Sequence, residues 1–250
     1  MDEDPDSNLC ELHRLFWGKL ESSLYHTFKV KIPHHMTLEI EEGEGSDFTV
    51  IKLPAGVKFP FGGSMMLVPE IYQTFWDLVE SDDVDWQSRQ ERDQPFHFPT
   101  HATIIIGQPG IGQQCFFRLL CLALNVNYHT GKSVWENYIL IRRLQRKMVT
   151  IFCDHASFAH VFSSAGVRRV VLADVWSIPE LDNDSNCTAL INICTDLAQP
   201  PSHFSPKNRK GRVVVAISPN VEHWKSFTKE RAAGIYCMPT CDWDDLFCSW

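Results

Sequence analysis

The 250 residues of this chain, 44% hydrophobic and 22% charged, are enough to bury one sizeable core, or one core and a small appended unit. The net charge of −8 leaves no broad basic face, so charge does not indicate a nucleic-acid partner. Scattered cysteines and the absence of a 20-residue apolar run predict an intracellular protein, cytoplasmic or nuclear, without a membrane-spanning segment.

Residues 1–99 are predicted to form a small N-terminal α+β region. Apolar residues recur at helical intervals over 7–29, and again over 68–79, which predicts two helices. Between them, residues 36–53 alternate around a glycine-rich break and predict a β-hairpin. The polar, charged segment 81–99 has the composition of an exposed linker, so we place a domain boundary there.

Residues 100–250 alternate apolar runs with helical stretches, the arrangement of a parallel sheet flanked by helices. The expected strands are 103–106, 149–153, 169–174 and 212–218, with a weaker one at 234–238. The expected helices are 134–147, 187–197 and 222–231. The fold class is therefore predicted to be α/β.

A glycine-rich turn, Gly107-Gln108-Pro109-Gly110-Ile111-Gly112, follows the first of these strands directly. Glycine permits backbone angles that let several amides point at one anion, so the turn is suited to phosphate. A working P-loop reads GxxxxGK[ST], in which the lysine neutralises phosphate and the hydroxyl binds Mg²⁺. Here Gln113 and Gln114 stand in those two places, and neither can supply the charge or the hydroxyl.

The second half of this motif lies farther along the chain, at Gly131-Lys132-Ser133, and an amphipathic helical stretch follows it. Removing the 19 residues 113–131 joins Gly112 to Lys132 and completes a Walker A sequence between a strand and a helix. We interpret this insertion as a retained intron, and a genuine insertion in a divergent loop stays open. A helical insertion would displace Lys132 by roughly 28 Å, so weak or absent binding of ATP and Mg²⁺ is expected.

An apolar strand that ends in Asp174 has the Walker B pattern, whose carboxylate would join Ser133 at the Mg²⁺ ion. We therefore expect the strands 103–106 and 169–174 to be neighbours, or to be separated by one strand. Val175 follows where many ATPases place a catalytic glutamate, so the sequence gives little support for efficient hydrolysis.

Residues 104–112, 132–135, 138–144 and 150–152 together resemble the P-loop module of fungal Crinkler-like and retrotransposon-hot-spot-like proteins. Ser218-Pro219 and the segment around 236–246 are similar to that family's sensor strand and to the segment after that strand. The resemblance covers roughly residues 65–250. It implies a P-loop NTPase fold of the additional-strand class that binds ATP and Mg²⁺. The implied phosphate and metal residues are Gly107, Gly110, Gly112, Lys132, Ser133 and Asp174.

Two other classes of function stay open. A non-catalytic interaction module that keeps the NTPase fold would fit Gln113, Gln114 and Val175 as they stand. A dinucleotide-binding oxidoreductase is less favoured because the glycine spacing is GxxGxG, and because Asp154 lies 47 positions beyond Gly107, where about 20 is expected.

Overall fold

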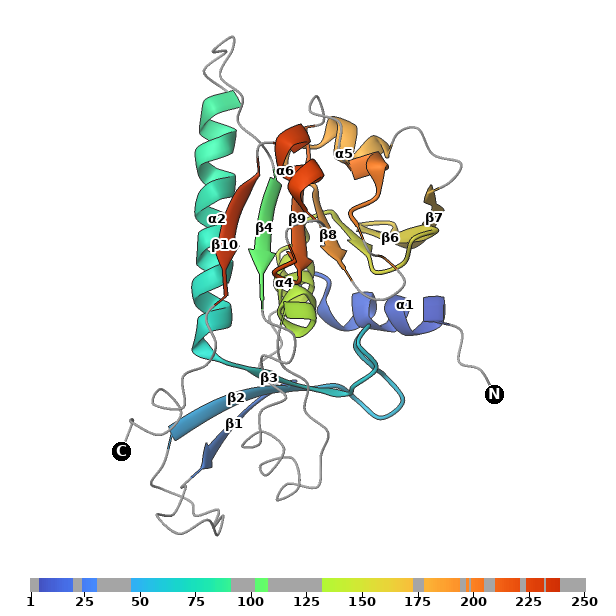
Figure 1. Ribbon diagram of the computed structural model, residues 1–250. Coiled ribbons are helices and arrows are strands. Elements are labelled where there is room, and N and C mark those ends of the chain that lie inside the picture. Colours follow the sequence, from blue (N-terminus) through green and yellow to red (C-terminus); the bar gives the residue numbers. More distant parts are fainter. Residues whose placement is uncertain are drawn as a thin grey trace.

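The protein is built around a seven-stranded sheet with helices on both faces, and a second sheet of three strands lies beyond one end of it (Figure 1). The computed structural model describes residues 5–19, 24–30, 46–90, 102–107, 132–172, 178–193, 197, 199–204, 210–220, 224–231 and 233–238. None of the helices within these ranges has the length and apolar character needed to cross a membrane.

The large sheet has the strand order β10-β4-β9-β8-β5-β6-β7. The first five strands in this order run parallel, whereas β6 and β7 extend the far edge as an antiparallel hairpin. The strands are β4 (Ala102–Ile106), β5 (Thr150–Cys153), β6 (Phe158–Ser163), β7 (Gly166–Val171), β8 (Thr188–Asn192), β9 (Arg212–Ile217) and β10 (Gly234–Cys237).

The central strands are buried on both faces, which explains their nearly continuous apolar sequences. Successive residues alternate between two cores. In β9, for example, Val214 faces one core while Val213 and Val215 face the other. Helix α4 (Lys132–Gln145) covers the first face, and α5 (Pro179–Asn183), the short 3₁₀ helix η3 (Ser202–Phe204) and α6 (Lys225–Arg231) accompany the second.

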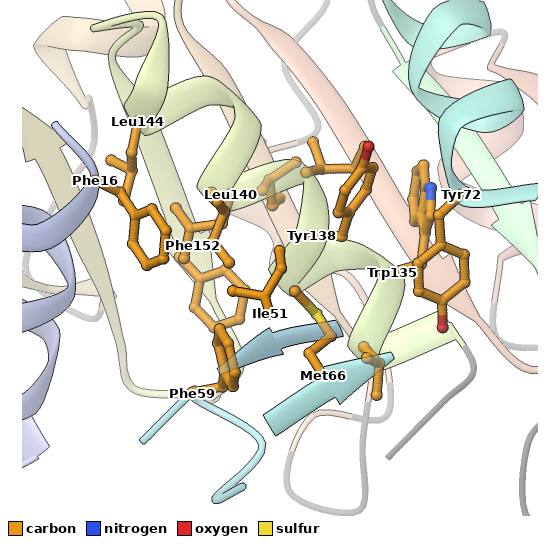
Figure 2. Packing of buried hydrophobic residues seen from close by; sticks show 14 of the residues in the cluster. Phe16, Ile51, Phe59, Met66, Tyr72, Trp135, Tyr138, Leu140, Leu144 and Phe152 are labelled. Carbon is orange, nitrogen blue, oxygen red and sulfur yellow. The ribbon is translucent and has the colours of Figure 1, made fainter. Parts of the chain in front are cut away.

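The N-terminal region packs on the α4 side and shares its core. It comprises α1 (Pro5–Phe16), α2 (Glu70–Gln90) and an antiparallel sheet of β1 (Tyr25–Val30), β2 (Ser46–Lys52) and β3 (Met65–Val68). Ile51 and Met66 of the small sheet lie beneath α4, and Tyr72 of α2 lies beside Trp135 (Figure 2). One hydrophobic core therefore joins the N-terminal elements to the large sheet.

Two buried arginines connect the layers through hydrogen bonds. Arg143 of α4 donates from Nε to Thr150 Oγ1 at 3.1 Å, and from Nη2 to the carbonyls of Val149 at 3.2 Å and Asn186 at 2.5 Å. Arg212 of β9 donates to Thr103 Oγ1 at 2.7 Å and also to a main-chain carbonyl of α2. The first arginine fixes the end of α4 to the sheet, and the second fixes α2.

Several predicted elements are confirmed, with boundaries shifted by a few residues. The strands predicted at 103–106, 149–153, 212–218 and 234–238 correspond to β4, β5, β9 and β10. The helices predicted at 68–79, 134–147 and 222–231 correspond to α2, α4 and α6.

Other predicted elements are wrong. The helix expected over 7–29 ends at Phe16, and the chain then forms β1, which pairs with β2 in place of the expected hairpin. The helix expected at 187–197 is instead strand β8, whose first four residues are buried in the sheet. Residues 81–90, expected in an exposed linker, continue helix α2 because a polar composition does not prevent a helix.

Candidate functional site

The five parallel strands end at one edge of the sheet. Gly107 follows β4 there, Ser218 follows β9, Asn192 ends β8, and Asp154 follows β5. The chain leaves β4 toward β5 on the α4 side, and it leaves β9 toward β10 through α6 on the other side. The neighbouring strands β4 and β9 therefore continue into connections on opposite faces of the sheet. Open α/β sheets bind ligands at the point where two neighbouring connections diverge in this way.

Gly107 lies at this divergence. Its amide donates to the carbonyl of Ile217 at 3.2 Å, so the first residue of the glycine-rich turn is held against the end of β9. The register pairs Ile106 with Ile217 immediately before it. The turn therefore starts at the divergence of the crossovers, where a bound anion would be expected.

Helix α4 begins at the same edge. Ser133, in its first turn, donates from Oγ to Asn192 Oδ1 at 3.0 Å, across 59 residues of sequence. The Nδ2 of Asn137 donates to the Ser133 carbonyl at 2.7 Å. Asn192 extends toward α4 because Leu190, two residues earlier, also faces that side of the sheet.

A buried carboxyl group makes a second connection between α4 and the strand ends. Glu136 is fully buried, and its Oε1 accepts a hydrogen bond from the Ala216 amide at 3.1 Å. The first turn of α4 contains no acidic residue. The partial positive charge of the helix N-terminus is thus held at the strand ends. Because no acidic residue in that turn offsets this charge, the position favours an anion.

Asp154 is the acidic residue at the end of β5. Burial raises the pKa of its carboxyl group above the usual range, and nearby His160 partly opposes that shift. The His160 ring nitrogen Nε2 lies 2.8 Å from Asp6 Oδ1 of α1. The register places Asp154 one strand farther from β4 than Asn192.

The predicted phosphate residues are in part described. Gly107 and Ser133 both lie at the carboxyl edge, and Lys132 is the first residue of α4. Residues 113–131 lie outside the described residues, so the expected displacement of Lys132 along a helical insertion stays a prediction. The remaining predicted site residues lie outside the described residues, and these are Gln108, Pro109, Gly110, Ile111, Gly112 and Asp174.

The prediction that the strand 169–174 lies next to the strand 103–106, or is separated from it by one strand, is wrong. The segment predicted at 169–174 gives β7, an antiparallel edge strand that four others separate from β4. The strand separated from β4 by one strand is β8, and it ends in Asn192. Its sequence, Thr-Ala-Leu-Ile-Asn, is an apolar run that ends in a polar residue. That pattern was the signal in the sequence from which this strand and its polar end could have been identified.

The Ser133 and Asn192 oxygens at this edge bring no negative charge to bind a metal ion. Ser133 and Asn192 offer a hydroxyl and an amide oxygen, both neutral, whereas Mg²⁺ is usually held by carboxylates and phosphates. In the part of the chain that the structure describes, no group of three or more His, Cys, Asp or Glu residues could hold a metal ion. No family model, curated protein or solved structure matches the chain.

Proposed function

We propose that this chain is a nucleoside-triphosphate-binding module of the P-loop type, related to the Crinkler-like and retrotransposon-hot-spot-like proteins. The turn 107–112 and the first residues of α4, Lys132 and Ser133, form its phosphate site. The insertion 113–131 weakens binding in this form of the chain.

The observation that carries the proposal is the hydrogen bond from Ser133 Oγ to Asn192 Oδ1 at 3.0 Å. In a P-loop site the hydroxyl after the lysine lies beside the end of the strand that bears the Walker B residue. Ser133 was identified from the sequence by its place after Lys132, and its partner lies 59 residues farther along.

The strand order gives independent support. In the additional-strand class, one strand separates the P-loop strand from the Walker B strand. Between β4 and β8 lies only β9, and the chain reaches β5 from β4 through α4. The positions of Gly107, α4 and β8 therefore support the proposal.

Binding without hydrolysis fits the residues better than an ATPase. The residue after Asn192 is Ile193, which is buried and cannot activate a water molecule. The next acidic residue along the chain after Val175 is Glu180, and it forms an ion pair with Arg168 at 2.6 Å. These features also favour the second candidate, an interaction module that keeps the fold without using the nucleotide.

The test is a titration of fluorescent ATP into the chain that lacks residues 113–131. We expect saturable binding that Lys132→Ala reduces by at least about tenfold, because the lysine supplies a charge-assisted contact to phosphate. Lys210→Ala is the matched control, since Lys210 is exposed and precedes β9 at the opposite edge of the sheet.

Equal losses in the two lysine variants would show that binding depends on overall charge and not on this site. Competition by NAD with the same strength as ATP would favour the dinucleotide-binding class. Failure of the folded deletion chain to bind any nucleotide would favour the interaction module.

A further inference from the structure

Asn192 occupies the place at this site where a negative charge is expected. It ends the parallel strand that one other strand separates from β4, and its side chain lies on the face that α4 covers. Its Oδ1 accepts the Ser133 hydroxyl at 3.0 Å, so the amide oxygen points at the first turn of α4.

We infer that Asn192 replaces the metal-side carboxylate, so that this chain binds a triphosphate with little contribution from Mg²⁺. The inference rests on the proposed nucleotide site. An amide oxygen can contact a divalent cation, but it brings no charge to offset the cost of stripping water from Mg²⁺. The Ser133 hydroxyl is neutral as well, and Ile193 offers no donor side chain.

The other acidic groups near this edge are placed differently. Glu136 is fully buried and accepts a hydrogen bond from the Ala216 amide, which holds its Oε1 toward β9. Asp154 stands one strand beyond Asn192, and burial favours its neutral form. Among the residues that the structure describes, the carboxyl that could compensate for Asn192 is therefore Asp154, and an experiment can separate the two.

Without a bridging metal ion, the positive end of α4 must carry most of the attraction for phosphate. The affinity of such a site depends more on the charge of the ligand's phosphates than on whether the ligand carries a bound metal ion. We therefore expect the preferred ligand to be the free nucleoside triphosphate, and its magnesium complex to bind no more tightly.

The experiment measures the affinity for fluorescent ATP in excess EDTA and in excess Mg²⁺, for the full chain and for the chain without residues 113–131. We expect affinities within about twofold of each other in the two conditions. Asn192→Asp should then add at least about tenfold in affinity in Mg²⁺ only, since a carboxylate contributes a charge-assisted contact. Mn²⁺ in place of Mg²⁺ allows bound metal to be counted by electron paramagnetic resonance, independently of hydrolysis.

Asn183→Asp is the matched control. It makes the same change of charge at an exposed position of α5, on the opposite side of the sheet, and should leave both affinities unchanged.

The inference is overturned if the chain with Asn192 already binds ATP at least tenfold more tightly in Mg²⁺, and loss of that gain in Asp154→Asn would identify Asp154 as the carboxylate. It is also overturned if Asn192→Asp binds ATP but gains nothing from Mg²⁺. Absence of ATP binding by every folded variant in both conditions would instead contradict the proposed nucleotide site, and the inference with it.

Discussion

Replacing Arg143 by methionine should destabilise the protein strongly, although the residue lies at the end of α4 away from the proposed phosphate site. Arg143 is almost fully buried and donates three hydrogen bonds, to Thr150 Oγ1 and to the carbonyls of Val149 and Asn186. Methionine fills much of the same space but offers no donor. Part of the volume is kept, so the loss comes chiefly from the hydrogen bonds.

The size of the effect follows from those three bonds. A hydrogen bond to a charged group contributes about 1.5–3 kcal/mol, but removing the buried charge also removes its desolvation cost. We expect a net loss of about 3 kcal/mol in the free energy of unfolding. With a urea dependence of about 3 kcal/mol per molar, the unfolding midpoint would fall by about 1 M.

The assay is equilibrium unfolding in urea, followed by circular dichroism and by tryptophan fluorescence. Arg143→Lys should lose less than Arg143→Met, because it keeps the charge without the forked geometry. Arg14→Met is the control, since Arg14 is exposed on α1 and pairs with Glu11 of the same helix. A midpoint for Arg143→Met within about 0.2 M of the unmodified chain would refute the role given to this arginine.

Two further predictions concern buried groups whose pKa values are raised. Burial raises the pKa of Tyr138 to about 12, so the free energy of unfolding should be steady below pH 10 and fall as the pH rises from about 10 to about 12. Tyr138→Phe should abolish that part of the fall, and absorbance at 295 nm should lose a component that titrates near pH 12; an unchanged titration curve would contradict this. Burial also raises the pKa of the Cys187 thiol to about 12, so iodoacetamide at pH 8 should modify exposed Cys10 and Cys237 but spare Cys187 until the protein unfolds. Peptide mass mapping of the native protein checks this, and rapid labelling of Cys187 would show that the thiol is accessible.

The parallel strands with strong apolar runs could be predicted from the sequence. Elements whose apolar pattern fits both a helix and a strand could not be assigned correctly. Within 187–197, Cys187, Leu190, Ile191 and Leu197 are spaced as on a helical face, yet residues 188–192 form a five-residue strand in the sheet. A short apolar run cannot be assigned by periodicity alone, because a buried strand needs no alternation. The hairpin of β6 and β7 was missed for a similar reason, since β6 is buried on both faces.

The candidate site was predictable as far as local motifs reach. Gly107, Lys132 and Ser133 were identified from the glycine spacing and the flanking strand and helix, since those constraints are local. Asn192 was not, because a search for an acidic residue after an apolar strand selects Asp174. Only the order of strands in the sheet identifies β8 as the relevant strand, and that order depends on long-range packing.

The most direct test of the central claim compares the affinity for fluorescent ATP of the full chain with that of the chain lacking residues 113–131. The described ends of the loop are Gly107 and Lys132, so the 24 residues 108–131 must be ordered around the phosphates, compared with the five residues 108–112 after the deletion. Ordering the longer loop on binding costs more conformational entropy, because more residues lose their backbone freedom. We predict that the deletion chain binds ATP at least about tenfold more tightly than the full chain. Equally tight binding by both chains would contradict the account, because it would show that the insertion leaves the phosphate site intact.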